Sequence, residues 1–257
     1  MTADAKPPRP DYGLDAPGVV RNLFLVGAAG LALRLSAAVG LWSGVVAHVD
    51  LAGTGIGFFV TFTLTALYMV WSSRVGKIKD REQLLDHVAW RGDEQVLDVG
   101  CGRGLLLIGA AKRLTTGRAT GIDIWQTEDL SGNCMEATLE NARREGVADR
   151  VEVKTADMRQ MPFADGTFDA VVSSWAVHNL YDPKDRDRAV AEIARVLKPG
   201  GTAVIKDIRH IGQYAAALTA NGCPDVRRVD SRAASLFTTV LTFGSLRPGV
   251  LVACKDD

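Results

Sequence analysis

The longest uninterrupted apolar segment of the chain spans residues 51–73, which include no side chain that is charged at neutral pH. A helix needs about 20 such residues to cross a hydrocarbon core of roughly 30 Å. Tyr68 and Trp71 lie near one end of the segment, where amphipathic rings favour the membrane interface. The pattern predicts a transmembrane helix.

A second apolar stretch precedes it, from Asn22 to about Ala47, with Arg34 near its centre. An arginine at the middle of a bilayer costs roughly 2.5–3.5 kcal/mol on insertion scales, and the surrounding Leu, Val and Ala residues offset part of that cost. We expect a first spanning helix here. An interfacial or re-entrant segment is one alternative, and a pair of buried helices in a soluble protein is another.

Basic residues flank the two apolar segments on their outer sides, whereas the connection near Asp50 has neither Lys nor Arg. By the positive-inside rule, both ends of the hairpin then face the cytoplasm. We therefore predict three parts: a cytoplasmic segment over 1–18, a transmembrane helical hairpin over 19–74, and a cytoplasmic domain over 75–257 at the cell membrane.

From residue 80 onward, short β-type runs alternate with amphipathic helical stretches, which is typical of parallel βαβ crossovers in a doubly wound sheet. Strands are expected at Gln95–Val99, Ala119–Ile124, Val151–Ala156, Phe168–Ser173, Thr202–Asp207 and Gly249–Ala253. Helices are expected at Leu105–Leu114, Glu136–Glu145, Arg186–Leu197 and Gln213–Asn221. Gly200–Gly201 reads as the stop between a helix and the next strand. A strand near Val226–Val229 would complete a seven-stranded α/β sheet with an antiparallel C-terminal hairpin.

Charge and cysteine usage narrow the function. The 30 Lys and Arg residues balance the 30 Asp and Glu residues, with no long basic run, so nucleic acid is not an expected partner. The four cysteines are scattered and form no C-x-x-C pair. The sequence therefore predicts neither a metal site nor a disulfide framework.

The strongest local motif is Val96–Gly104, with the sequence VLDVGCGRG. An apolar strand ends in a glycine-rich turn that runs directly into a helix, so the backbone can approach a ligand closely. Leu105 stands where a dinucleotide fingerprint would have its third glycine. This departure disfavours a nicotinamide or flavin oxidoreductase.

Polar residues also follow the next strands. Asp123 ends the second strand about twenty residues after the glycines, where a carboxylate can accept hydrogen bonds from ribose hydroxyls. Asp157 follows the third strand, and Ser173 ends the fourth. In an open α/β sheet these strand ends share one crevice, which is where such sheets bind ligands.

Together, VLDVGCGRG, GIDIW, the Ala-Asp-Met run at 156–158, FDAVVSS and ARVLKPGG resemble the successive motifs of class I S-adenosylmethionine-dependent methyltransferases. The resemblance is close over about 90–207. The whole chain also resembles bacterial methyltransferases with two N-terminal membrane helices. The resemblance implies a Rossmann-like fold and S-adenosyl-L-methionine as cofactor.

The same resemblance assigns roles to individual residues. Gly100, Cys101, Gly102 and Gly104 would hold the methionine part, with Asp98 anchoring their loop. The nucleoside would be bound further along the sheet: Asp123 would bind the ribose, Ile124 would pack on adenine, and Asp157 with Met158 would contact the adenine edge, while Ser173 would complete the cofactor-binding set.

For catalysis, methyl transfer mainly requires alignment, and a general base is needed only for a protonated acceptor. His178, just after the fourth strand, is the candidate base; a structural or cofactor-shaping role is the alternative. Tyr181 and Asn179 are candidates for orienting the acceptor, and His210 is a further acceptor-side candidate.

The predicted hairpin is the main clue to the substrate, because a tethered domain meets lipid-phase molecules at high effective concentration. It favours a lipophilic small-molecule acceptor such as an isoprenoid, a quinone precursor, a phospholipid headgroup or a hydrophobic thiol. Two alternatives remain: a soluble acceptor with the hairpin bound to another membrane protein, and a non-catalytic cofactor-binding membrane module that recruits a partner. The apolar segment Ala233–Gly244 is either core or a lid facing the membrane.

Overall fold

The computed structural model describes residues 9–40, 51–229 and 247–256. The chain divides into two compact units. The first, called the sheet domain here, includes residues 9–12, 79–125 and the described residues from 133 onward. The second, called the helical unit, includes the described residues of 13–78 together with 126–132. The boundaries at 18/19 and 74/75 stay predictions.

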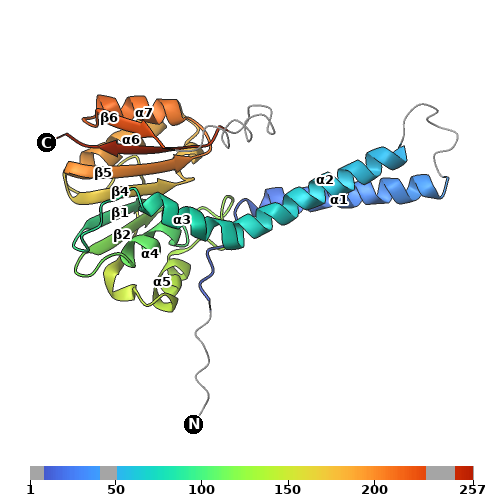
Figure 1. The fold of residues 1–257 in the computed structure, drawn as a ribbon, viewed down its shortest axis with the longest axis horizontal. Coiled ribbons are helices and arrows are strands. Elements are labelled where there is room, and N and C mark those ends of the chain that lie inside the picture. The colour runs from blue at the N-terminus through green and yellow to red at the C-terminus, as the bar shows by residue number, and fades with distance from the viewer. Residues whose placement is uncertain (1–8, 41–50, 230–246, 257) are drawn as a thin grey trace, which may run out of the picture. The chain divides into compact units, whose positions relative to one another are not determined.

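Seven strands form a single sheet in the sheet domain, in the order β3-β2-β1-β4-β5-β7-β6 (Figure 1). The strands are β1 (Gln95–Val99), β2 (Arg118–Asp123), β3 (Val151–Thr155), β4 (Phe168–Ser174), β5 (Leu197–Asp207), β6 (Asp225–Arg228) and β7 (Gly249–Cys254). All neighbouring strands among β1 to β5 are parallel to one another, whereas β7 runs antiparallel to both β5 and β6. The chain order reverses between β1 and β4, which is the switch point of a doubly wound sheet.

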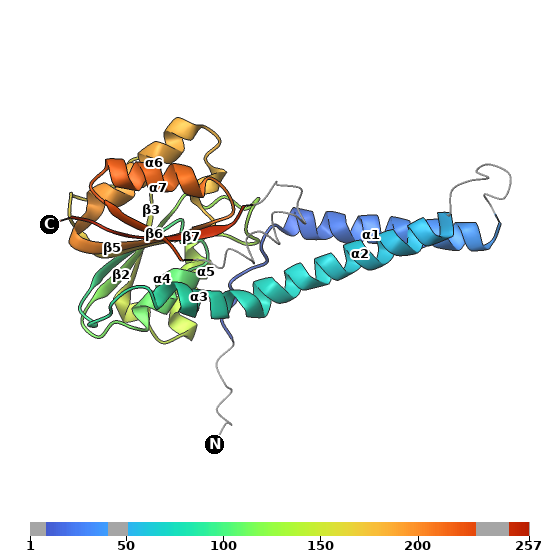
Figure 2. The same cartoon turned by 45° about the horizontal axis from the view of Figure 1, so that its top comes forward.

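Helices cover both faces of this sheet (Figure 2). The helices are α3 (Lys77–Leu85), α4 (Leu105–Ala111), α5 (Met135–Arg144), α6 (Pro183–Val196) and α7 (Ile211–Ala220), with short 3-10 turns at η2 (Ala148–Arg150) and η3 (Val177–Asn179). Alternate β1 residues point to opposite faces: Leu97 is buried with α6 and α7, and Val96 with α3, α4 and α5. A strand buried on both faces reads as a continuous apolar run, which explains why β1 and β4 are visible in the sequence.

The predicted fold is confirmed, with an α/β seven-stranded sheet and an antiparallel C-terminal pair. One local prediction is wrong. The expected stop at Gly200–Gly201 lies inside β5, because α6 ends at Val196 and β5 begins at Leu197. The pairing of β4 with β5 shifts register between Phe168 and Ala170. The glycines therefore form an irregular start of the strand rather than a connection before it.

The helical unit contains α1 (Pro17–Ala38), α2 (Leu51–Trp71) and the π-helical turn η1 (Ser72–Gly76). Glycines let α1 and α2 approach closely: a Cβ at Gly30 would lie 2.7 Å from the Cβ of Phe58, and one at Gly55 would lie 2.7 Å from the backbone N of Arg34. Small residues at such contacts are typical of helix pairs in membranes. Arg34 lies four residues before Ala38, where α1 ends.

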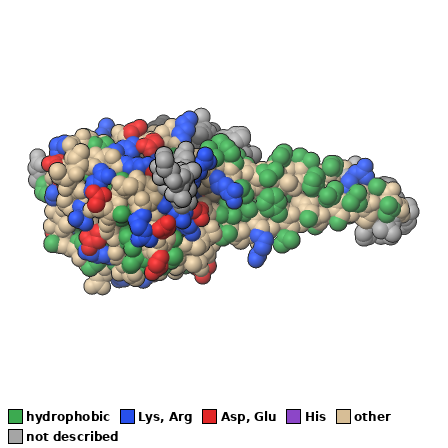
Figure 3. All heavy atoms as spheres, turned by 90° about the horizontal axis from the view of Figure 1, so that it is seen from below, with side chains coloured by type: hydrophobic (Ala, Val, Ile, Leu, Met, Phe, Trp, Pro, Cys, Tyr) green, Lys and Arg blue, Asp and Glu red, His purple; other side chains and the backbone are tan. Residues whose placement is uncertain are grey.

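Two helices of the described chain, Pro17–Ala38 and Gly53–Leu85, are long and apolar enough to cross a membrane. On the face seen in Figure 3, hydrophobic side chains are spread along α1 and α2. The exposed apolar residues of the two helices include Val19, Phe24, Leu25, Val26, Leu35, Ile56, Phe58, Val60, Leu64, Leu67, Tyr68 and Trp71. The segment Ala233–Gly244, predicted as core or lid, lies outside the described residues.

Polar contacts tie the start of α1 to the other parts of the helical unit. Lys77 Nζ lies 3.2 Å from Asp15 Oδ1, and the Ser73 hydroxyl donates to Asp15 Oδ2 at 3.1 Å. The backbone N–H of Leu14 donates to Ser131 Oγ at 2.8 Å. The loop at 126–132 is therefore held to the segment that leads into α1.

Candidate cofactor and acceptor site

The glycine-rich turn after β1, residues 100–104, is called the cofactor loop here. Gly100, Gly102 and Gly104 have φ values of 73°, 52° and 83°, a region that L side chains rarely adopt. A Cβ at Gly100 would lie 2.3 Å from the Cβ of Ala176. The turn therefore requires glycine for its backbone conformation, and at Gly100 also for space.

Asp98 lies beneath this loop, on β1. It is buried, and its Oδ2 accepts a 2.8 Å hydrogen bond from the backbone N–H of Leu107 in the first turn of α4. Burial raises the pKa of Asp98 to about 7, opposed by the bond from Leu107 and assisted by the negative charge of Asp123. Asp98 thus anchors the helix that follows the loop.

Asp123, at the end of β2, connects three segments. Its Oδ2 accepts from the backbone N–H of Gly102 at 2.8 Å, while Oδ1 accepts from the backbone N–H of Trp125 at 2.7 Å and from Asn133 Nδ2 at 3.3 Å. The carboxylate therefore lies directly beside the cofactor loop, as the spacing of about twenty residues predicts.

Ile124 follows Asp123 and is 50% exposed, which is unusual for a large aliphatic side chain at a strand end. Trp125, by contrast, is half-buried, and its indole N–H donates to Thr155 Oγ1 at 2.7 Å. Ile124 thus presents an open apolar face next to the carboxylate, and Trp125 packs onto β3.

Asp157 and Met158 come from the adjacent strand end, because Asp123 pairs with Thr155 in the β2–β3 register. The Asp157 carboxylate is held by Arg159, whose Nη2 lies 2.6 Å from Oδ2. Hydrogen bonds from Arg159 hold the pKa of Asp157 below its usual value despite partial burial. Met158 points toward the loop, since its Cε lies 3.7 Å from the position of a Cβ at Gly100.

Cys101 and Ser173 are both buried. The sulfur of Cys101 faces the sheet, 2.8 Å from the position of a Cβ at Gly121, and burial raises the pKa of its thiol. The hydroxyl of Ser173 donates to the carbonyl of Val99 at 2.8 Å. The side chain of Cys101 therefore packs against the sheet, and only its backbone contributes to the cofactor loop. Ser173 joins the end of β4 to the end of β1.

Strained backbone is concentrated at this edge of the sheet. Four described residues other than glycine have positive φ. Three of them lie within three residues of a strand end: Trp125 at 63° after β2, Trp175 at 54° after β4 and His210 at 62° after β5. Such conformations cost about 1–3 kcal/mol each and cluster at functional sites.

His178 lies on η3, beyond the end of β4, next to the buried Asp207 at the end of β5. Its Nδ1 lies 2.6 Å from Asp207 Oδ1, a close polar contact whose angle is not that of a hydrogen bond. The backbone N–H of His178 donates to Asp207 Oδ2 at 3.0 Å, and the hydroxyl of Tyr214 donates to the same oxygen at 3.2 Å. Burial and the Asp207 charge raise the pKa of Tyr214, so Tyr214 stays a donor.

The loop after His178 is held by Arg186, a buried residue of α6. Its Nη1 donates to the carbonyls of Leu180 and Tyr181 at 2.7 Å and 2.9 Å. The Tyr181 side chain itself is 96% exposed, so this structure places it in solvent. His210 is also largely exposed. Its partial burial and the nearby Arg186 charge lower its pKa.

Sequence reasoning missed Asp207 and Arg186 as parts of this site. Asp207 was visible only as the last residue of a strand, 29 residues after His178. Arg186 lies in an amphipathic helix, where an arginine ordinarily indicates a solvated face. Among the described residues, no group of three or more His, Cys, Asp or Glu side chains is arranged to hold a metal ion.

The fold and the strand-end residues together define an α/β domain of the kind that binds a nucleoside at its switch point. Asp123 and Asp157 lie on neighbouring strands at the same edge of the sheet. This arrangement meets the geometric requirement for a nucleoside pocket.

Comparisons with known proteins assign the class. Residues 97–205 match the family described as "Methyltransferase domain". The methyltransferase GfsG of Streptomyces halstedii is 36% identical over 127 residues, which cover 49% of this chain and 42% of that protein. The ubiquinone/menaquinone biosynthesis C-methyltransferase UbiE of Roseobacter denitrificans is 30% identical over 131 residues, covering 51% and 49%. The chain thus spans about half the length of these relatives.

The fold has a solved counterpart. The crystal structure of geranyl diphosphate C-methyltransferase from Streptomyces coelicolor matches with a TM-score of 0.55 at 18% identity, covering 77% of this chain and 84% of that one. Over residues 97–205 the sheet domain is therefore similar to S-adenosylmethionine-dependent methyltransferases of class I.

The residues present fit S-adenosylmethionine. Asp123 supplies a carboxylate for two hydroxyl donors, and Ile124 supplies an open apolar face for a base. Gly100 and Gly104 leave backbone where side chains would otherwise project. Each of these groups matches one part of a nucleoside with an amino-acid tail.

Proposed function

We propose that this protein is a membrane-anchored methyltransferase that uses S-adenosylmethionine to methylate a lipophilic small molecule at the cytoplasmic face. One observation carries the proposal: the candidate cofactor residues follow β1, β2 and β3, whereas His178 and Asp207 follow β4 and β5. The switch point between β1 and β4 separates the two groups of residues. The nucleoside and the acceptor would therefore bind on either side of the switch point, at the same edge of the sheet.

S-adenosylmethionine supplies an electrophilic methyl group when bound. In the proposed site, Asp123 holds the ribose, Ile124 contacts the adenine face and the cofactor loop follows the methionine part. Asp157 and the Met158 backbone contact the adenine edge, with Asp157 accepting from the amino group beside Arg159. Alignment of this kind supplies roughly 7–11 kcal/mol of barrier reduction.

On the acceptor side, we assign His178 the role of general base. Asp207 lies on the Nδ1 side of the ring, and in the proposed mechanism Nε2 is the nitrogen that faces the acceptor. The lone pair of Nε2 would take the acceptor proton as the acceptor bonds to the methyl carbon, while the bond between that carbon and the cofactor sulfur breaks and the sulfur leaves as the thioether of S-adenosylhomocysteine. The positive charge on the ring would be stabilised by the Asp207 carboxylate. Arg186 keeps the loop that carries Tyr181 in place by its two carbonyl contacts.

The proposed membrane anchor is supported by the surface of the helical unit. In the apolar windows of the two candidate spans, 17% and 11% of residues are buried, which is unlike a helix in a soluble core. At about 1.5 Å per residue, the 22 residues of α1 and the 21 of α2 each reach roughly 30 Å. The relative named for ubiquinone and menaquinone biosynthesis is consistent with a lipophilic acceptor.

The test uses the full chain in lipid nanodiscs with cofactor labelled on its methyl group. A lipid extract and an aqueous extract, both prepared from one batch of cells, serve as the sources of the methyl acceptor. We expect label in the lipid fraction, and we expect His178→Ala to lower kcat by about 10²–10⁴-fold while leaving the Kd of S-adenosylhomocysteine unchanged. Asp207→Asn should lower kcat in the same direction, because the ring loses its charged partner.

Each outcome separates one alternative. Label in the aqueous fraction alone contradicts a lipophilic acceptor and retains the enzyme. Cofactor binding without transfer to either fraction favours the non-catalytic membrane module. Full activity of His178→Ala contradicts its role as base.

A further inference from the structure

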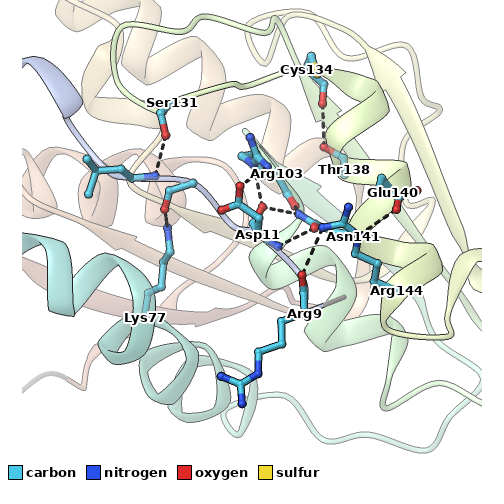
Figure 4. Close-up of polar contacts among 12 residues, drawn as sticks. Arg9, Asp11, Lys77, Arg103, Ser131, Cys134, Thr138, Glu140, Asn141 and Arg144 are labelled. Atoms are coloured by element: carbon cyan, nitrogen blue, oxygen red, sulfur yellow. Dashed lines mark hydrogen bonds and ion pairs between the residues drawn. The ribbon is translucent and has the colours of Figure 1, made fainter. Parts of the chain in front are cut away.

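The N-terminal residues Arg9–Tyr12, called the clasp here, lie along α5 in the sheet domain (Figure 4). Asn141 of α5 holds the clasp from both sides of its amide: Oδ1 accepts from the backbone N–H of Asp11 at 2.9 Å, and Nδ2 donates to the carbonyl of Asp11 at 2.8 Å. Arg144 donates to the carbonyl of Arg9 at 3.2 Å. The amide of Asn141 thus acts as a backbone partner would.

The same contacts reach the cofactor loop. Nδ2 of Asn141 also donates to the carbonyl of Arg103 at 3.0 Å. Arg103 is the loop residue between Gly102 and Gly104, and its Nε donates to the carbonyl of Asp11 at 2.7 Å. Its Nη2 lies 2.9 Å from Asp11 Oδ2. The clasp and the loop are therefore joined directly by Arg103 and also through Asn141.

Tyr12 anchors the end of the clasp. It is buried, its hydroxyl donates to Glu145 Oε1 at 3.2 Å, and it accepts from Arg81 Nη1 at 3.4 Å. Burial and the Glu145 charge raise the pKa of Tyr12, so it stays protonated as a donor. A buried aromatic ring with a satisfied hydroxyl contributes both area and direction.

Ordering the cofactor loop has a high cost in conformational entropy. Glycine loses more conformational freedom on ordering than other residues do, and three of the five loop residues are glycine. A loop that is fixed before the ligand arrives spares the ligand that ordering cost. Thr138, which donates to the carbonyl of Gly102 at 2.6 Å, fixes the same loop from α5.

We propose that the clasp pre-orders the cofactor loop, with Asp11 and Asn141 as positioning residues for S-adenosylmethionine binding. The inference builds on the proposed function and concerns its cofactor half alone. Only residues 13–16 separate the clasp from the first residue of α1, Pro17. The chain segment that enters the apolar hairpin is thus the one that holds the loop, and cofactor affinity depends on residues outside the 97–205 methyltransferase match.

The experiment measures the Kd of S-adenosylhomocysteine by calorimetry for the full chain in nanodiscs. Asn141→Ala removes bonds to both the clasp and the loop, and we expect about a tenfold weaker Kd. Asp11→Ala removes a pair whose carboxylate is 66% exposed, so we expect about threefold. Asp11→Glu should restore part of the loss. Glu136→Gln, at an exposed position on the same helix, is the matched control and should bind as the unaltered chain does.

Two further readouts distinguish positioning from general stability. The melting temperature of Asp11→Ala without cofactor should equal that of the control. By linkage, saturating S-adenosylhomocysteine should slow hydrogen exchange at the Asp11 amide. Unchanged Kd in Asp11→Ala and Asn141→Ala, or exchange that ignores the ligand, overturns the clasp. Failure of the unaltered chain to bind S-adenosylhomocysteine would instead contradict the cofactor assignment in the proposed function.

Discussion

A carboxylate offers about four acceptor positions, and at Asp123 three donors are already present. The bond from Asn133 is the longest, at 3.3 Å, whereas those from Gly102 and Trp125 are 2.8 Å and 2.7 Å. A ribose diol can therefore bind by using the open position and displacing the weakest donor. The carboxylate keeps the loop attached during this exchange.

We predict that Asp123→Ala weakens S-adenosylhomocysteine binding by about 100-fold. Because one of the two ribose bonds replaces the bond from Asn133, the net loss is about one charge-assisted hydrogen bond, or about 1.5–3 kcal/mol. Calorimetry with the full chain measures the effect. Asp149→Ala, at an exposed carboxylate on η2, is the control. An unchanged affinity in Asp123→Ala would contradict the placement of the nucleoside on β2.

Asp98 predicts a pH dependence of stability. Its pKa is about 7 in the folded protein because of burial, against an ordinary value of 3.8. Between about pH 4 and pH 7 the unfolded chain therefore releases this proton while the folded chain retains it. The unfolded state binds fewer protons, so the contribution of Asp98 to stability falls as pH rises through this window.

The measurement compares the unfolding free energy of the unaltered chain with that of Asp98→Asn in detergent between pH 4 and pH 8. Asn keeps an acceptor for the Leu107 N–H and removes the titration. The stability of the unaltered chain relative to the variant should decline up to about pH 7 and then level off. A difference that is independent of pH would show that Asp98 does not titrate in this window.

The requirement for glycine in the turn between β1 and α4 can be tested by substitution. Gly100→Ala places a Cβ 2.3 Å from that of Ala176, in a left-handed conformation. We expect a loss of about 3 kcal/mol, since strain and overlap each cost about 1–3 kcal/mol. Gly212→Ala, at the start of α7 with no atom within 4 Å of the added Cβ, should be neutral or stabilising. Thermal unfolding of both variants decides; equal melting temperatures would contradict the steric argument.

The sequence predicted elements well where burial made their pattern local. The predicted bounds of β1 match the structure, and β4 extends one residue further. The start of β5 was missed because Lys198–Gly201 has turn composition, whereas its pairing is set by Phe168 and Lys255 on distant strands. A tertiary contact of this kind overrides local propensity.

The candidate site shows the same limit of local pattern. Asp98, the glycines and Asp123 follow strands at family spacing, so their positions were predictable. The contact of His178 with Asp207 joins residues 29 apart, and that of Asp11 with Arg103 joins residues 92 apart. Such pairs have no signal in neighbouring sequence. The contact of His178 with Asp207 becomes visible only when the sheet brings the ends of β4 and β5 together.

The whole chain combines the sheet domain with a helical unit whose two apolar helices are each long enough to span a bilayer. Val39 directly follows α1, and Arg74 lies in the turn after α2. In the sequence, α2 therefore separates the two positions. For the proposed membrane anchor, the positive-inside rule predicts that the Arg74 end faces the cytoplasm and the Val39 end faces outward. The native cysteines lie at 101 and beyond, on the predicted cytoplasmic side.

We therefore predict that a membrane-impermeant maleimide added to intact cells labels Val39→Cys and leaves Arg74→Cys unlabelled. After the membrane is permeabilised, Arg74→Cys should react as well, which controls for its accessibility. Label on Arg74→Cys alone in intact cells would reverse the orientation and place the methyltransferase domain outside. Label on both would mean that α1 and α2 do not separate the two positions by a bilayer, and the anchor would then be interfacial.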